Sequence, residues 1–404
     1  MQVYAIHADQ WFDGERLHTQ PVSCLVAQGR IVHLITGPLG ATPWPASWHQ
    51  APCLRTAFLM PGLVDAHVHL FLDGDATDAQ ERQAHQHAGL DAWLVMGRRN
   101  LQRAQAAGIT CVRDCGDAYG INQLLRAEEN GPGQMQVLSA GCGIRAPKRY
   151  GSFFATEWDP AWGPEAVASI AGDADLIKLV LSGIIDFAAA AVKGRPQFAA
   201  EELRPIVVGA RVLGLPTTAH CSGDDAIATA ITAGLDGIEH GFCMRPEQLM
   251  QLADADVVWC FTWRPVDAVR RHPDLFGVDD AAVAGIGRIL DAHRAQLARA
   301  PAAGVQVLPG TDAGSMGVPH GRSLVHELRA LAAAGWDTQR ILHAATRAPR
   351  QRWGLPGGRL AVGERMDCAG FAQAPDADFT GWEQADLVVC GGALVQEPAE
   401  RVCA

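Results

Sequence analysis

Apolar runs of strand length alternate with amphipathic stretches through the middle of the chain. Four stretches, Leu90–Ala107, Ala199–Leu213, Asp224–Ala233 and Val283–Ala303, repeat their apolar residues at helical spacing. The apolar runs around them have the length and composition of buried strands. The strand candidates are Leu63–His69, Ile109–Asp114, Gln136–Ala140, Leu176–Leu181, Pro216–His220, Gly237–His240, Val257–Thr262 and Val305–Thr311.

Strands that alternate with helices pair in parallel through right-handed crossovers. Eight such units favour an α/β fold of the (β/α)8 TIM barrel type, which usually takes about 250 residues. The alternative is an open, doubly wound sheet with a glycine-rich dinucleotide loop. Only Gly141-Cys142-Gly143 approaches that loop, and it lacks the third glycine. We therefore predict a TIM barrel over residues 58–352.

Both ends of the chain have a different pattern, in which short strand-like runs are separated by glycine turns. Examples are Cys24–Gln28 and Ile31–Ile35 near the start, and Ala385–Val389 near the end. Strand-rich segments on either side of a barrel indicate one small β-sandwich domain built from both. We predict that residues 1–57 and 353–404 form it.

Composition narrows the class of protein. The 404 residues carry 33 Lys and Arg against 44 Asp and Glu, a net charge of -11, which argues against a nucleic-acid partner. No apolar run reaches the roughly 18–20 residues that cross a membrane. We see no signal peptide, and the 11 cysteines are scattered without a CxxC pair, so we expect a cytoplasmic protein with reduced thiols. A small-molecule substrate is the expected partner, and the sequence leaves a homo-oligomer open.

Polar residues end several of the strand candidates. His67 and His69 alternate along a strand and therefore project from the same face, as half of a metal site would. His220, His240 and Asp312 end later strands, and Lys178 lies inside an apolar one, where an unpaired charge is costly. Each alone is more often structural. Since the strands of a barrel end at one mouth, all six together predict a metal centre.

These segments resemble the metal-dependent amidohydrolase superfamily. Within it, the chain looks closest to the imidazolonepropionase-related branch that contains Xaa-Pro and Xaa-Arg dipeptidases. The resemblance covers nearly the whole chain. It is carried by Pro61-Gly62-Leu63-Val64-Asp65-Ala66-His67-Val68-His69, Asp175-Leu176-Ile177-Lys178, His220, Glu239-His240-Gly241 and Gly310-Thr311-Asp312-Ala313.

The resemblance implies a dinuclear site of the carboxylated-lysine type. One divalent metal ion, most suitably Zn²⁺, would be held by His67, His69 and Asp312, and a second by His220 and His240. Lys178 would carry a carbamate derived from CO2 that bridges the two ions. A metal-bridging hydroxide would then attack an amide carbonyl, with Asp312 as the catalytic base and acid. The expected substrate is a dipeptide or an N-acyl amino acid.

Other functions stay open at this point. A cyclic amide, lactone or carbamate is an alternative substrate; a mononuclear deaminase is less favoured, because resembling deaminases commonly lack the lysine. A degenerate, non-enzymatic relative would not keep all six polar positions. Substrate contacts should come from loops after the strands, and the candidates are Arg145, Tyr150, Arg264 and His320. His85-Gln86-His87 repeats the HxH spelling in a helical context and is not expected to bind metal.

Overall fold

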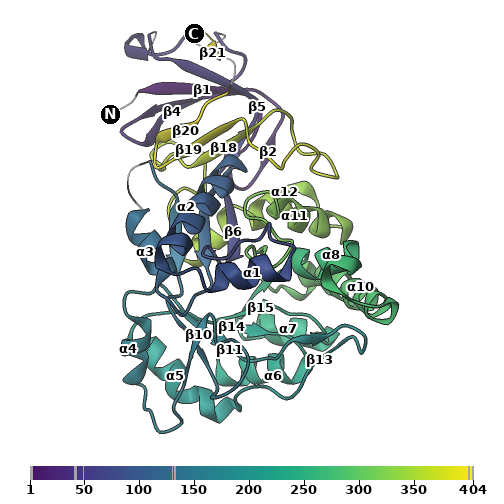
Figure 1. Cartoon of the computed structure of the whole chain (residues 1–404). Helices are drawn as coiled ribbons and strands as arrows, with labels where there is room; N and C mark the ends of the chain where they lie inside the picture. Colours follow the sequence, from purple (N-terminus) through teal and green to yellow (C-terminus); the bar gives the residue numbers. More distant parts are fainter. Residues whose placement is uncertain are drawn as a thin grey trace.

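The computed structural model describes residues 3–40, 43–48, 50–129, 131, 133–398 and 401–402. It is a mixed α/β fold in two parts (Figure 1). The first and last strands of the chain lie together at the top of the view. The parallel strands and nearly all the helices form the larger part below them. This division agrees with the prediction of a barrel beside a β-domain built from both ends of the chain.

Eight strands of the larger part coincide with the eight predicted segments, within three residues at each end. They are β6 (Leu63–Val68), β7 (Ile109–Asp114), β8 (Gln136–Ser139), β11 (Ile177–Val180), β14 (Thr217–Cys221), β15 (Gly237–His240), β16 (Val258–Phe261) and β17 (Val307–Pro309). Two short strands, β9 (Gly143–Arg145) and β10 (Ala155–Glu157), join them. All ladders are parallel, in the orders β6-β7-β8 and β10-β9-β11-β14-β15-β16-β17.

The segment after β17 meets β6 and brings the two parallel sheets together. Asp312 donates its backbone N–H to the His67 carbonyl, and His69 donates to the Ala313 carbonyl, both at 2.8 Å. The buried Asp65 carboxylate accepts from the backbone N–H of Thr311 at 3.0 Å and from its hydroxyl at 2.7 Å. These bonds place the carboxyl ends of β6 and β17 side by side, as in a TIM barrel.

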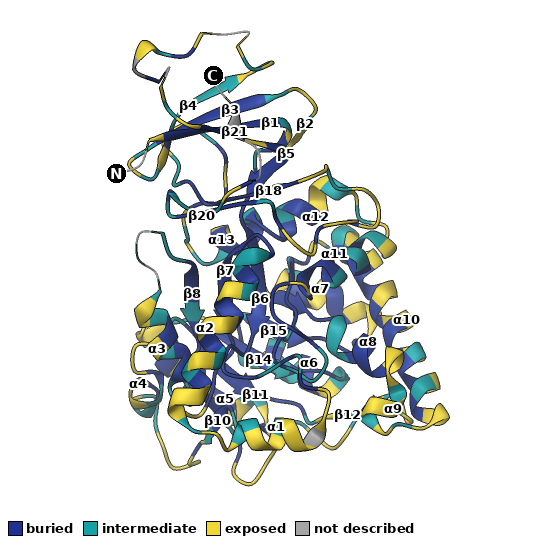
Figure 2. Cartoon of the chain, turned by 45° about the horizontal axis from the view of Figure 1, so that its top comes forward, coloured by how far each residue is buried: buried dark blue, intermediate teal, exposed yellow. Residues whose placement is uncertain are grey.

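The helices pack around these strands, with buried inner faces and exposed outer faces (Figure 2). The predicted helical stretches are confirmed, although the longest begins three residues earlier than expected, because Asp279 caps it by accepting from Ala282 N–H. The helices are α1 (Ala79–Gln86), α2 (Leu90–Ala106), α3 (Ile121–Glu128), α4 (Ala166–Ala171), α5 (Ala200–Val212), α6 (Asp224–Ala233), α7 (Pro246–Asp254), α8 (Arg264–Arg271), α9 (Pro273–Phe276), α10 (Asp280–Ala303), α11 (Leu324–Ala333), α12 (Thr338–Ala344) and α13 (Arg347–Arg352).

The terminal part is a nine-stranded sheet with β5 at its centre, parallel to β1 and antiparallel to β18. β5 runs on to Pro61, a few residues past the predicted boundary at residue 58. The strands of this nine-stranded sheet are β1 (Tyr4–Phe12), β2 (Leu17–His18), β3 (Val22–Ala27), β4 (Arg30–Thr36), β5 (Cys53–Pro61), β18 (Cys368–Phe371), β19 (Leu387–Cys390), β20 (Ala393–Gln396) and β21 (Arg401–Val402). Outside these sheets lie the pair β12 (Ile185–Asp186) and β13 (Ala191–Val192), and one 3-10 turn, Ala46–Trp48.

A single residue, Gly62, links β5 to β6. A Cβ atom at Gly62 would lie 2.0 Å from the Thr110 hydroxyl oxygen, so only glycine fits there. Ten cysteines lie among the described residues and all are free thiols, as predicted. None of the helices in the described ranges is both long and apolar enough to cross a membrane.

Candidate metal centre

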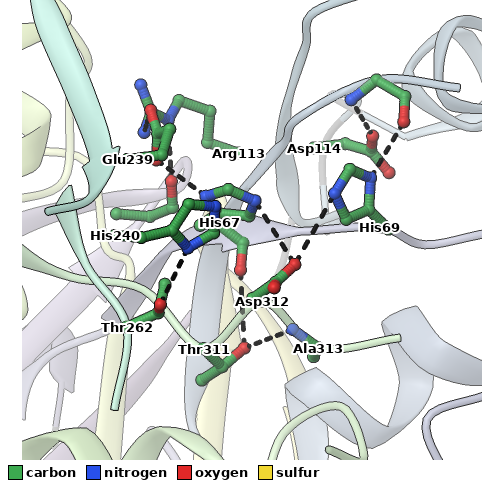
Figure 3. A network of polar contacts seen from close by, with 12 residues as sticks. His67, His69, Arg113, Asp114, Glu239, His240, Thr262, Thr311, Asp312 and Ala313 are labelled. Carbon is green, nitrogen blue, oxygen red and sulfur yellow. Dashed lines mark hydrogen bonds and ion pairs between the residues drawn. The ribbon is translucent and has the colours of Figure 1, made fainter. Parts of the chain in front are cut away.

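His67 and His69 leave the end of β6 on the same face, as the alternation predicts. Each ring has a hydrogen-bond partner at Nδ1. For His67 this is the Glu239 carboxylate at 2.7 Å, and for His69 it is the Gly116 carbonyl at 2.9 Å. The Nε2 atoms of both rings face Asp312 Oδ1, at 3.4 and 3.6 Å (Figure 3). Three potential ligand atoms therefore point at one place.

The next ligand candidates come from the neighbouring strands β14 and β15. His240, the last residue of β15, has a φ of 70°, an uncommon backbone conformation for a residue other than glycine. Its Nδ1 lies 2.9 Å from the Thr262 hydroxyl. The His240 ring lies 4.9 Å from that of His67 and 4.6 Å from that of His220. Ligand atoms of His67, His240 and Asp312 all lie within 4.8 Å of one another.

Lys178 lies in the middle of β11 with only 1% of its surface exposed. It is in register with Thr218, two residues before His220. Its positive charge lowers the pKa of all four histidines of the cluster. The structure thus brings the six residues predicted as metal ligands into one cluster, in which His220 and Asp312 are partly exposed and the other four are buried.

The protonation states suit metal binding. Burial, with a smaller effect of Lys178, lowers the pKa of His69 to about 3 and that of His220 to about 4. Burial also holds the pKa values of His67 and His240 well below the usual range. All four imidazoles are neutral at pH 7, which is the form that coordinates a cation. Four neutral imidazoles, three of them oriented through Nδ1, and one carboxylate form a donor set that fits a divalent metal ion.

Glu239 and Arg113 also support the cluster, and the sequence analysis did not assign them a role. The Glu239 carboxylate accepts from Arg113 at 2.6 Å and from the Thr218 hydroxyl at 2.5 Å, besides its contact with His67. Burial alone would raise the pKa of Glu239, but Arg113, Lys178 and His67 together hold it well below the usual range. The sequence did contain one signal for this ion pair, because Arg113 is an arginine inside the apolar run Ile109–Asp114.

Among the predicted substrate contacts, Tyr150 lies beside the cluster. Its ring is 5.7 Å from that of His220. Burial, and then Asp312, raise the pKa of Tyr150 to about 12, so its hydroxyl stays protonated at neutral pH. Arg145 faces elsewhere: its guanidinium contacts the Arg149 carbonyl at 2.9 Å and Glu157 at 3.0 Å.

Of the other two predicted contacts, one lies close to a ligand candidate and the other lines a different cavity. His320 is 2% exposed and close to His69, and burial lowers its pKa to about 3. Arg264 follows β16 and lines a cavity of about 420 Å³ that includes none of the six ligand candidates.

An arginine that the sequence analysis did not single out lies close to Asp312. Arg82 of α1 donates to the Gly314 carbonyl at 3.0 Å. Burial lowers its pKa, while the charges of Asp312 and Tyr150 oppose that shift, so these groups lie close together. The same helix contains His85, which bonds the Phe71 carbonyl at 2.6 Å and is not part of the metal cluster, as predicted.

Comparisons with known proteins show the family of the chain. Residues 58–395 match the Amidohydrolase family, and the chain belongs to that family. It is therefore an enzyme that acts on carbon–nitrogen bonds. A relative from Mycobacterium tuberculosis, an uncharacterized protein, is 29% identical over 347 residues, 83% of this chain and 84% of its own length.

Solved structures match over almost the full length. A Xaa-Pro dipeptidase with methionine in its active site has a TM-score of 0.78 at 19% identity, covering 98% of this chain and 100% of the other. A prolidase in complex with n-methylphosphonate-L-proline has a TM-score of 0.79 at 21% identity, with the same coverage. At these identities, the likeness establishes the fold alone.

Proposed function

We propose that this protein is a dinuclear metal-dependent hydrolase, on a (β/α)8 barrel, that cleaves the amide bond of a dipeptide or an N-acyl amino acid. The observation that carries the proposal is the convergence of neutral, oriented imidazoles on Asp312 and buried Lys178. The prolidase and dipeptidase among the structural neighbours are consistent with it.

The proposed ligand sets are those that the resemblance implies. His67, His69 and Asp312 would hold one ion and His220 and His240 the other, with Zn²⁺ the best match to imidazole. Lys178 would join both as a carbamate formed with CO2. Two divalent cations at such a site supply Lewis acidity, which lowers the pKa of water and polarises a carbonyl group.

The chain's own contribution to proton transfer is Asp312. Burial raises its pKa to about 6, although Lys178 opposes the shift. A carboxylate beside the attacking water can accept a proton from it and release that proton again. We assign Asp312 the removal of a proton from the attacking water and its delivery to the leaving nitrogen.

Arg82 and Tyr150 favour a substrate that carries a carboxylate. Both lie close to Asp312, and both are donors at neutral pH. An arginine inside a partly buried site binds a carboxylate more strongly than at an exposed surface, because fewer water molecules compete. Dipeptides and N-acyl amino acids have such a group, whereas simple lactones and cyclic amides lack one.

The test compares substrate pairs that differ only in that group. Zinc- and bicarbonate-supplemented enzyme is assayed on Xaa-Pro and N-acetyl amino acids and on their C-terminal amides. We expect the free acids to have the higher kcat/KM, and Arg82→Gln to raise KM for the acids by about 10- to 100-fold, with little change for the amides. Arg99→Gln, at an exposed position of α2, is the matched control.

Three results would contradict the proposal. Equal turnover of acids and amides would remove the carboxylate from the substrate class. Turnover of lactones or cyclic amides alone would show that the substrate class is one of these instead of a dipeptide or an N-acyl amino acid. A fully active preparation with fewer than two equivalents of metal would contradict the dinuclear site.

A further inference from the structure

A cavity of about 620 Å³ lies at the opposite end of the parallel strands from the metal cluster. Gly237 and Val258, which line it, are the first residues of β15 and β16. Leu176 and Pro216, which directly precede β11 and β14, also line it. His240, in contrast, is the last residue of β15. None of the six ligand candidates, all of which the structure describes, lines this cavity, which we call the amino-terminal cavity.

Small side chains leave the space between the strands open at this end. The Thr218 hydroxyl donates to the Glu239 carboxylate, so both side chains project between the strands. Gly237, two residues before Glu239 and therefore on the same face of β15, has no side chain to fill the space. Bulky branched residues usually fill such an interior. Leu138, in register with Arg113, is only half-buried, although the other three residues of β8 are buried. The cavity thus extends inward from the surface.

Arg113 of β7 lines the same cavity and has one donor that the protein leaves unused. Its Nε donates to the Ala66 carbonyl at 2.7 Å, and its Nη2 donates to Glu239 at 2.6 Å (Figure 3). Nη1 has no hydrogen-bond partner among the described residues and is not one of the fully buried atoms. The side chain is 8% exposed, and the Trp353 ring lies 5.0 Å from its Cζ as a flat neighbouring wall. An accessible N–H group therefore faces the cavity.

The charges around the amino-terminal cavity balance. Three arginines and three acidic residues line it, namely Arg113, Arg211, Arg352, Asp175, Asp236 and Glu239. Asp175 already pairs with Arg126 at 2.7 Å, and Asp236 accepts from the Thr217 hydroxyl at 2.7 Å. An anion bound to Arg113 would also lie near the Glu239 carboxylate, and like charges repel. The cavity therefore favours a neutral ligand.

The remaining walls are largely apolar. Leu176, Leu215, Val258 and Leu355 contribute to them, together with the ring of Trp353. Pockets for small molecules are commonly about 300–1,000 Å³ in volume and mostly apolar, with a few polar groups that fix the orientation of the ligand. The amino-terminal cavity has this size and this composition.

We propose that the amino-terminal cavity binds a neutral, mainly apolar small molecule whose carbonyl or hydroxyl oxygen accepts from Nη1 of Arg113. A hydrogen bond from a charged donor is stronger than one between neutral groups, and the apolar walls remove the rest of the ligand from water. The ligand lies beside the ion pair of Arg113 and Glu239, without contact to the six ligand candidates.

The test is a ligand-detected NMR titration of zinc-loaded enzyme with acetophenone, which is neutral and has one ring and one carbonyl oxygen. Benzoate, an anion of similar size, is titrated separately. We expect Leu138→Trp to weaken acetophenone binding about 10-fold or more, because the larger ring occupies the cavity. Arg113→Lys keeps a cation beside Glu239 and lacks Nη1, so it should weaken acetophenone binding about 3- to 10-fold. Benzoate binding, at the metal centre or elsewhere, should be the same in wild type and Leu138→Trp.

Leu124→Trp, at an exposed position of α3 outside the cavity, is the matched control and should leave acetophenone binding unchanged. Zinc-free protein should bind acetophenone as the zinc-loaded enzyme does, so the test does not depend on the proposed hydrolase. If Leu138→Trp does not fold, Leu355→Trp at the half-buried wall replaces it.

The proposal is overturned by acetophenone binding that is unchanged in the cavity variant, or equally weakened in Leu124→Trp. Unchanged binding in Arg113→Lys would refute the contact with Nη1. Loss of benzoate binding together with that of acetophenone in Leu138→Trp would refute the preference for a neutral ligand.

Discussion

At the scale of single residues, the histidines of the cluster depend on partners outside the ligand set. His67 is held by Glu239, which is held in turn by Arg113 and Thr218. An acceptor at Nδ1 fixes the tautomer that directs the Nε2 lone pair toward a metal ion. The ionised state of Glu239, maintained by Arg113, is therefore part of the metal affinity of the site.

This dependence predicts the effect of Glu239→Gln. The substitution keeps the size of the side chain and removes its charge, so His67 is no longer fixed in one tautomer. We expect zinc affinity, measured by competition with a chelator, to fall about 10- to 100-fold.

Glu327→Gln is the matched control, since Glu327 is equally buried and bonds only backbone N–H groups of the α8 start. Unchanged zinc affinity in Glu239→Gln would refute the role of Glu239. The same loss in both variants would point to a general effect of neutralising a buried carboxylate.

At the scale of elements, periodicity was sufficient to locate the strands that carry the ligand candidates, because buried parallel strands are continuous apolar runs. It could not identify contacts that exist only after the strands come together in the folded protein. The ion pair of Arg113 and Glu239 joins β7 to β15, and no spacing in the sequence connects them. Arg82 was missed for a related reason: α1 is polar on most faces, so nothing marks which one faces the site.

One helix offers a clean test of packing. α10 contains two glycines two residues apart. A Cβ at Gly285 would lie 1.7 Å from the Phe187 carbonyl oxygen, whereas one at Gly287 would meet nothing within 4 Å. We expect Gly285→Ala to destabilise the protein by about 1–3 kcal/mol, because the neighbouring backbone must move.

Gly287→Ala should instead stabilise it by about 1 kcal/mol, since alanine is the better helix former. Urea unfolding of both variants measures the difference. A similar change in the two would mean that α10 does not approach the Phe187 carbonyl closely.

At the scale of the whole molecule, buried histidines link the stability of the fold to pH. His293 of α10 is 2% exposed, and neither ring nitrogen has a hydrogen-bond partner. Burial lowers its pKa to about 3. In the unfolded chain the same group titrates near its ordinary value of about 6.5. The unfolded state therefore binds a proton at pH values where the folded state does not.

The stability that depends on neutral His293 is complete above pH 6.5 and is lost as the pH falls toward about 3. We expect His293→Phe to flatten the decline in unfolding free energy between about pH 7 and about pH 4.5, relative to wild type with the same metal content. Urea unfolding at several pH values measures it. His33→Phe, at an exposed position, should leave the slope unchanged; if His293→Phe does too, the acid sensitivity has another origin.

The central place of β5 has a consequence for synthesis on the ribosome. One edge of β5 pairs with β1 soon after it is made, but its other edge pairs with β18, which is translated only after all the parallel strands of the larger part. Until then the nascent chain presents an open strand edge, and such edges attract other chains. A bound chaperone, or slow release of the last segment, would therefore affect the yield of this protein more than its final stability.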